Sequence, residues 1–196
     1  MTLILIIVSY ILGSIPSALI IGKVFFNKDI RKLGSGNLGT TNTIRNLGKK
    51  AGFVVFALDF LKGFVSLAIA NFYLGDLSYL SIFGAAAMIG HMFPIFAGFK
   101  GGKAVATGSS IFIYLYPYLA IVQILVFFIV LLLSGYVSLG SVTIASIGAI
   151  YTLINGEGID KFVISFMCIF VIYMHRSNII RIKNGTENIS KLKIKF

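Results

Sequence analysis

Long apolar stretches separated by short polar connections dominate the chain from its first residues almost to its end. They fall at about 2–22, 51–71, 78–98, 104–117, 118–134, 141–155 and 160–174. A helix that crosses a bilayer needs about 20 predominantly apolar residues. The pattern therefore predicts an all-α polytopic membrane protein with about seven transmembrane helices.

The number of spans depends on how the stretch 104–134 is divided. It is too long for one span and short for two, and Pro117 in its middle predicts a turn between two helices. The last two apolar stretches are also short. Five spans, with the other segments partly embedded, is the alternative. Since no separate soluble segment interrupts the pattern, we expect one membrane domain, residues 1–196.

Basic residues gather in only some of the polar connections. They are frequent in 23–50, in 98–103 and in the tail after 174, whereas the other connections carry the acids Asp76, Glu157 and Asp160. Positive charge marks the cytoplasmic ends of membrane spans. The N-terminus is therefore expected outside and the C-terminus in the cytoplasm, which both seven and five spans allow. The first apolar stretch lacks a basic segment before it and is expected to remain as a span.

Composition narrows the class of partner. The formal net charge is +11, yet charged residues make up only 12% of the chain and hydrophobic residues 58%. Soluble domains carry about 25% charged residues. This apolar background argues against nucleic acid and favours the bilayer, together with anionic small molecules, as the partners. Cys168 is the one cysteine, so neither a disulfide within the chain nor a Cys/His metal cluster is expected, and we predict no metal or cofactor.

The first polar segment of interest is GSGNLGTTNTIRNLGKK, residues 34–50. Glycines allow positive φ, so that successive backbone N–H groups can point at one anion. A helix that begins near residue 41 would add its N-terminal dipole, and Arg45 offers a fork for two phosphate oxygens. Side chains and glycines that would line such a site are Ser35, Gly36, Asn37, Gly39, Thr40, Thr41 and Asn42. A flexible loop that caps a helix would show the same composition.

Two further polar segments follow apolar stretches. In FKGGK, residues 99–103, Lys100 and Lys103 flank Gly101 and Gly102, which predicts a tight positive turn at the membrane surface. Topology alone accounts for the lysines but not for the glycine pair. In HRSNIIRIKNGTEN, residues 175–188, a histidine is followed by several polar and charged side chains: Arg176, Asn178, Arg181 and Glu187. Alone, that segment is equally typical of a membrane interface.

Two charges lie inside an apolar stretch. Asp59 and Lys62 are three residues apart on one helix face, and we expect them to pair as a structural brace. The histidine–aspartate acyltransferase pattern H-x-x-x-x-D is absent, because Phe96 follows His91 at that spacing and Ile180 follows His175.

Together the segments GSGNLGTTN with Arg45, GHMFPIFAGFKGGKAVAT and MHRSNIIRIKNGTEN resemble the bacterial membrane acyl-phosphate:glycerol-3-phosphate acyltransferases, the PlsY family. Their order, their spacing and the span pattern extend the resemblance over essentially the whole chain. Two positions depart from the family pattern: Thr40 replaces a usual alanine and Ala104 a usual glycine.

The resemblance implies transfer of an acyl chain from acyl phosphate to the 1-hydroxyl of glycerol 3-phosphate. The products are lysophosphatidic acid and phosphate, the first step of phospholipid synthesis, without acyl-CoA or acyl carrier protein. By resemblance, Lys103, Arg45 and Ser35 bind glycerol phosphate. The loop Gly36–Asn42 with Ser141, His175 and Asn178 binds acyl phosphate. We expect a monomer in the bacterial plasma membrane, with its site facing the cytoplasm.

Two questions stay open at this level. Either a phosphate oxygen of the donor or His175 accepts the hydroxyl proton, and substrate assistance is the favoured hypothesis. A transporter of phosphate esters would share the spans and the anion-binding segments, although it would also need polar groups near the midplane. A membrane scaffold would show no turnover at all.

Overall fold

The computed structural model describes residues 1–75, 77–190 and 192–194. Every regular element in that part of the chain is a helix, which confirms the predicted all-helical class. The chain divides into two compact units, Met1–Tyr114 and Leu115–Phe196. That 1–196 forms a single functional domain stays a prediction, and Asp76 lies outside the described residues.

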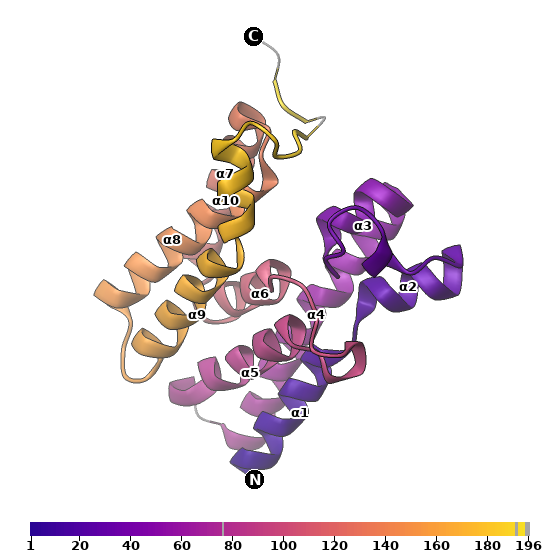
Figure 1. The fold of residues 1–196 in the computed structure, drawn as a ribbon. Helices are drawn as coiled ribbons and strands as arrows, with labels where there is room; N and C mark the ends of the chain where they lie inside the picture. The colour runs from indigo at the N-terminus through magenta and orange to yellow at the C-terminus, as the bar shows by residue number, and fades with distance from the viewer. Residues whose placement is uncertain (76, 191, 195–196) are drawn as a thin grey trace. The chain divides into compact units, whose positions relative to one another are not determined.

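The first unit holds the elements from α1 to α6, and only the last residue of α6 belongs to the second unit (Figure 1). Their bounds are α1 Thr2–Ser14, α2 Ser17–Phe26, η1 Ile30–Lys32, α3 Thr40–Leu47, α4 Lys49–Leu74, η2 Leu77–Tyr79, α5 Leu80–Met92, η3 Ile95–Ala97 and α6 Val105–Leu115.

Two glycines bring α1 and α5 into backbone contact. A Cβ at Gly13 would overlap the carbonyl of Ala87, and a Cβ at Gly90 would overlap the carbonyl of Tyr10. Helices in membranes associate through such small residues, because lipid provides no hydrophobic driving force between them. This close packing anchors the end of α5, where the glycine-lysine turn begins.

A small apolar cluster packs against the polar segment 34–39. Its buried members come from α2, η1, α3, α4 and η3, and from the segment itself: Ala18, Leu19, Ile30, Leu38, Leu47, Ala51, Val55 and Ala97. Leu38 is the member that lies within the segment, so burial of its side chain holds the middle of a glycine-rich loop against the helices.

The second unit holds α7 (Pro117–Ser134), α8 (Val137–Asn155), α9 (Asp160–Met174) and α10 (Arg176–Lys183). Within it, α8 packs against both α7 and α9. Buried hydroxyls join α8 to α9, where Thr152 and Ser165 lie 2.7 Å apart. Such interhelical hydrogen bonds satisfy polar groups that lipid cannot.

Five helical segments in the described residues are long and apolar enough to cross a membrane: Thr2–Phe26, Lys49–Leu74, Leu80–Ala97, Pro117–Ser134 and Val137–Asn155. Taken as one span bent by 46°, α9 and α10 add a sixth, whereas α6 is an apolar helix of only 11 residues. All the predicted apolar stretches contain a helix. The span count of seven and the orientation of the termini stay predictions.

Several predicted boundaries were wrong, and proline explains two of them. The first stretch is broken between α1 and α2, because Pro16 lacks the N–H that a continuous helix requires. The stretch 78–98 ends its α-helix at Met92, two residues before Pro94. By contrast, Pro117 is the first residue of α7, which confirms the predicted turn there.

Candidate active site

The glycine-rich segment 34–39 leads directly into α3. Gly34 and Gly36 have φ of 56° and 70°, a region that residues with a Cβ rarely adopt. Gly39 is the N-cap residue of α3, and Thr40 is the first helical residue, so a helix does begin at this motif as predicted. It ends at Leu47, and the next residue, Gly48, has φ of 94°. The glycine-rich segment thus leads directly into a helix N-terminus, which favours an anion.

Asn42 is the internal brace of this loop. Its amide nitrogen donates to the carbonyls of Leu33 at 3.0 Å and Asn37 at 3.1 Å. Its amide oxygen accepts from the backbone N–H of Ser35 at 3.1 Å and from the side chain of Asn46 at 3.0 Å. The side chain is 3% exposed. Asn42 therefore shapes the loop from within, and its predicted contact with substrate stays a prediction.

Other predicted residues of the loop are more accessible. Ser35 and Arg45 are exposed, and the half-buried members are Gly36, Asn37, Gly39, Thr40 and Thr41. Just before the loop, a hydrogen bond from the Arg31 side chain lowers the pKa of the Asp29 carboxyl to about 2. In this ion pair, Arg31 Nη2 lies 2.7 Å from Asp29 Oδ2.

The turn between α5 and α6 carries Gly101, Gly102 and Lys103. The N–H of Gly101 donates to the carbonyl of Met92 at 3.1 Å, and that of Gly102 to the carbonyl of His91 at 3.0 Å. Lys103 is half-buried, and Ala104 after it has φ of 55°. The position where this chain departs from glycine is therefore one where the backbone favours glycine.

The first two predicted motifs meet in the folded unit. The backbone N–H of Leu38 donates to the carbonyl of Gly101 at 3.5 Å, so the glycine-rich loop and the glycine-lysine turn lie side by side. The sequence separates them by some sixty residues. This contact brings the predicted anion-binding residues of 34–45 close to those of 101–103.

The third motif lies in the second unit and is organised by a buried carboxylate. Glu187 is 6% exposed. Its Oε1 accepts from Asn178 Nδ2 at 2.7 Å and from Ser138 Oγ at 3.0 Å, and its Oε2 pairs with Arg181 Nε at 2.7 Å. Burial opposes ionisation, but the hydrogen bonds from Asn178, Arg181 and Ser138 leave the pKa of Glu187 below its ordinary value. Glu187 thus pairs with a nearby basic residue, Arg181.

His175 and Ser141 are both buried in this unit. His175 Nδ1 lies 2.8 Å from the carbonyl oxygen of Val171. Because a carbonyl only accepts, this contact places the proton of a neutral ring on Nδ1 and the lone pair on Nε2. Ser141 Oγ donates to the carbonyl of Val137 at 3.0 Å, one turn back in α8.

Three features were missed at the level of sequence. Ser138 had no signal beyond a small residue near a helix start, yet its hydroxyl reaches Glu187. The bracing role of Asn42 is invisible in composition, because any amide in a polar loop looks alike. The contact of His91 with the turn at Gly102 joins residues that the sequence motif already contained, but its geometry depends on how α5 ends. The predicted Asp59–Lys62 pair is confirmed, with 2.6 Å between Lys62 Nζ and Asp59 Oδ1.

The model of the family described as glycerol-3-phosphate acyltransferase matches residues 3–185. The chain belongs to the glycerol-3-phosphate acyltransferase family. It is accordingly an integral membrane acyltransferase, and the resemblance drawn from the motifs is confirmed.

Relatives that carry the name glycerol-3-phosphate acyltransferase cover nearly the whole chain. The protein of Listeria monocytogenes is 47% identical over 181 residues, which span 91% of both chains. That of Bacillus cytotoxicus is 48% identical over 189 residues, which span 95% of this chain and 93% of the relative.

Solved structures of PlsY (YgiH), an integral membrane glycerol 3-phosphate acyltransferase, are similar throughout. The glycerol 3-phosphate form has a TM-score of 0.89 at 41% identity, covering 95% of this chain and 94% of that one. The lysophosphatidic acid form has a TM-score of 0.86 at 39% identity, covering 97% and 95%.

Proposed function

We propose that this member of the family transfers the acyl group of an acyl phosphate to the 1-hydroxyl of sn-glycerol 3-phosphate, giving lysophosphatidic acid and inorganic phosphate. The observation that supports it best is the contact between the loop at Leu38 and the turn at Gly101. That contact gathers backbone N–H groups, a guanidinium and an ammonium in one unit, a set suited to a phosphate dianion.

The reaction needs no covalent intermediate on the protein. Acyl phosphate is a mixed anhydride, so the glycerol hydroxyl oxygen attacks the acyl carbon directly and the carbon–oxygen bond to phosphate breaks. The electron pair of that bond leaves with inorganic phosphate, and the hydroxyl proton passes to a phosphate oxygen. Catalysis is then mostly positioning and electrostatic stabilisation of the oxyanion.

In this proposal the first unit binds the acceptor. Lys103, Arg45 and Ser35 hold the phosphate of glycerol 3-phosphate. The exposure of Ser35 and Arg45 beside a loop braced by Asn42 supports that assignment. The Gly36–Asn42 segment serves the acyl phosphate through its backbone N–H groups other than those of Gly36 and Leu38, which donate to the carbonyls of Leu33 and Gly101.

His175, Asn178 and Ser141 of the second unit are assigned to the acyl phosphate. In a neutral His175 ring, the hydrogen bond to the Val171 carbonyl leaves the lone pair on Nε2. Such a ring is able to accept a proton or a hydrogen bond from phosphate, and the proposal keeps the donor phosphate as the base. Glu187 orients the Asn178 amide, which supports Asn178 as a donor to the oxyanion.

We further propose that the enzyme works as a monomer in the bacterial plasma membrane with its site facing the cytoplasm. Support comes from the placement of charge, because the loop before α3 and the turn before α6 carry the basic residues. Both substrates carry a polar phosphate group that is supplied from the cytoplasm, and the acyl chain of the donor belongs in lipid.

The decisive experiment mixes the purified protein with palmitoyl phosphate and glycerol 3-phosphate, follows phosphate release and identifies the lipid by mass spectrometry. A parallel reaction offers palmitoyl-CoA. We expect lysophosphatidic acid only from the acyl phosphate. Product from palmitoyl-CoA alone would overturn the proposed donor. Movement of unchanged glycerol 3-phosphate into vesicles, without product, would instead favour transport.

A further inference from the structure

A charged cluster is buried in the first unit, and none of its members is assigned above to substrate. It consists of Asp59 and Lys62 on α4 and His91 on α5, which are 2%, 7% and 7% exposed. Asp59 Oδ1 lies 2.6 Å from Lys62 Nζ and 3.6 Å from His91 Nδ1. Charges within membrane helices are costly and are usually kept for function. No step of the proposed reaction uses Asp59, Lys62 or His91.

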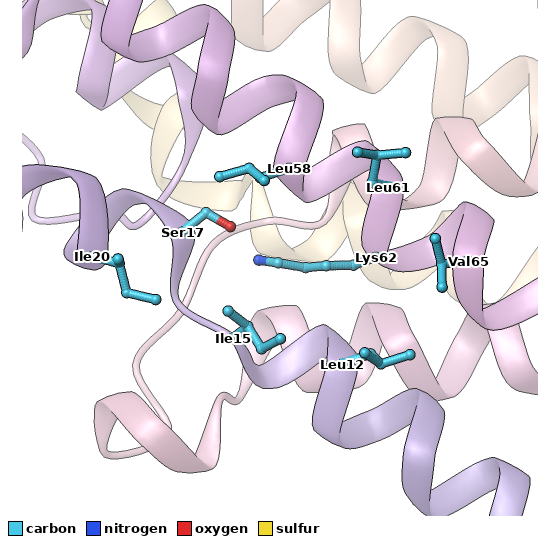
Figure 2. A pocket seen from close by; sticks show the side chains of 8 residues that line it. All are labelled: Leu12, Ile15, Ser17, Ile20, Leu58, Leu61, Lys62 and Val65. Atoms are coloured by element: carbon cyan, nitrogen blue, oxygen red, sulfur yellow. The ribbon is translucent and has the colours of Figure 1, made fainter.

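The Lys62 side chain also lines a mostly apolar groove. The groove is lined by Leu12, Ile15, Ser17, Ile20, Leu58, Leu61, Lys62 and Val65. Figure 2 shows the Lys62 side chain extended among these residues, between α4 and the segment of α1 and α2. The aliphatic stem therefore lies along apolar surface while the ammonium meets Asp59. Because the charges of Lys62 and Asp59 cancel, the pair adds no net charge near the proposed phosphate site.

The His91 ring lies between this ion pair and the glycine-lysine turn. One ring nitrogen, Nδ1, is on the side of Asp59. The other, Nε2, lies against Gly102, where a Cβ would overlap it. The carbonyl of His91 also accepts the N–H of Gly102 at 3.0 Å. The residue just before Lys103 is thus supported by the ring and hydrogen bonded to the backbone of the same histidine.

The segment after Lys103 is tied to the same place. Thr107 Oγ1, in the first turn of α6, donates to the carbonyl of Asp59 at 2.9 Å. Lys103 is therefore bracketed by two contacts, Gly102 on His91 and Thr107 on Asp59, that share one ion-paired cluster. A brace for stability alone has no reason to sit here, since buried ion pairs contribute little net stability compared with apolar packing.

We propose that His91, whose ring lies beside the Asp59–Lys62 ion pair, is a positioning residue that sets the place of the Gly101–Lys103 turn and thereby the affinity for glycerol 3-phosphate. The inference rests on the proposed function, in which Lys103 binds the acceptor phosphate. His91 itself touches no substrate in this scheme. It acts through the turn that lies on its ring.

The test measures equilibrium binding of glycerol 3-phosphate by calorimetry, without acyl donor, alongside KM for each substrate and the melting temperature. His91→Gln removes the ring, and Leu67→Ala is the control, because Leu67 is a fully buried apolar residue on α4 outside the Asp59–Lys62–His91 cluster. We expect His91→Gln to weaken glycerol 3-phosphate binding about tenfold or more while KM for acyl phosphate changes less than about twofold. Leu67→Ala should lower the melting temperature and leave the affinity of the folded protein unchanged.

A second pair of variants keeps the test sharp if His91→Gln folds poorly. Gly102→Ala should weaken binding because its Cβ meets the ring, and His91→Ala combined with Gly102→Ala should recover part of that loss by making room. Such non-additivity marks a direct coupling between the two residues. Additive losses in the double variant, or glycerol 3-phosphate affinity in His91→Gln within twofold of the parent, would overturn the inference. A folded parent that turns over acyl phosphate yet shows no affinity for glycerol 3-phosphate would overturn the proposed function instead.

Discussion

The side-chain amide of Asn178 donates to Oε1 of Glu187 at 2.7 Å, so a carboxylate nine residues away fixes the direction of a proposed oxyanion donor. The same oxygen accepts from Ser138 Oγ, which ties the start of α8 to the segment that follows α10. The geometry makes Glu187 the organiser of this unit's polar residues. Its neutralisation should therefore disturb Asn178 without removing any proposed substrate ligand.

Glu187→Gln should lower stability by about 1–3 kcal/mol, because Arg181 loses its ion-pair partner and the buried amide cannot satisfy both Asn178 and Arg181. Thermal unfolding in detergent measures this. Glu157→Gln is the control, since Glu157 is an exposed acid in the same unit. Equal effects of the two changes would show that Glu187 has no organising role.

The same carboxylate predicts a pH dependence. The pKa of Glu187 is lowered from 4.5 in the folded protein, so the unfolded chain binds the proton more tightly. The stabilisation is present above pH 4.5 and is lost as the pH falls through the lower folded value. The loss of stability between neutral and acidic pH should therefore be smaller in Glu187→Gln than in the parent, as measured by unfolding curves at each pH. Parallel pH profiles of stability in the two proteins would contradict this prediction.

Lys103→Ala should reduce kcat/KM by at least about 100-fold, since a phosphate dianion in a site of low dielectric loses its main counter-charge. Lys100→Ala is the matched control: an exposed lysine in the same turn, three residues away. Initial rates of phosphate release measure both variants. Comparable rates in the two would remove Lys103 from the site.

His175→Gln should retain substantial activity if the donor phosphate is the base. The amide replaces hydrogen bonding without a comparable proton acceptor, so we expect a loss in kcat of no more than about 100-fold. Single-turnover rates together with binding of glycerol 3-phosphate separate chemistry from affinity. A loss near four orders of magnitude with unchanged binding would instead identify His175 as the base.

Ala104→Gly should be neutral or stabilising, because a residue with a Cβ at φ of 55° is strained by about 1–2 kcal/mol. The control is the same substitution two residues later: Ala106→Gly, inside α6, should destabilise by about 1 kcal/mol. We expect Ala104→Gly to leave the melting temperature unchanged or to raise it, and Ala106→Gly to lower it. Equal destabilisation would show that the turn carries no backbone strain.

Hydropathy and charge were sufficient to predict the helices and the polar segments of this chain. The apolar stretches are long and strongly patterned, and Pro117 acted through local chemistry that requires no knowledge of the fold. The Asp59–Lys62 pair followed in the same way, since residues three apart on a helix always share a face.

Long-range contacts account for what sequence could not provide. Gln, Asn and Ser side chains look alike in a polar segment, so nothing local distinguished the brace Asn42 from its neighbours. His91 contacts Gly102 only because α5 ends at Met92 and the chain folds back on it. The break at Pro16 was available in the sequence, but the strong apolar pattern on both sides concealed it.

The shortness of α6 has a consequence for the membrane around the protein. Its 11 residues extend about 16 Å, roughly half of a hydrocarbon core of about 30 Å. Where a helix of this length crosses the core, the lipid beside it thins or one end of the helix lies below the surface, and either response costs elastic energy that grows with bilayer thickness. We expect turnover to fall as phosphatidylcholine chains lengthen in reconstituted vesicles, and rates independent of chain length would contradict this. The activity of such an enzyme would depend on the thickness of the bilayer that its own product helps to build.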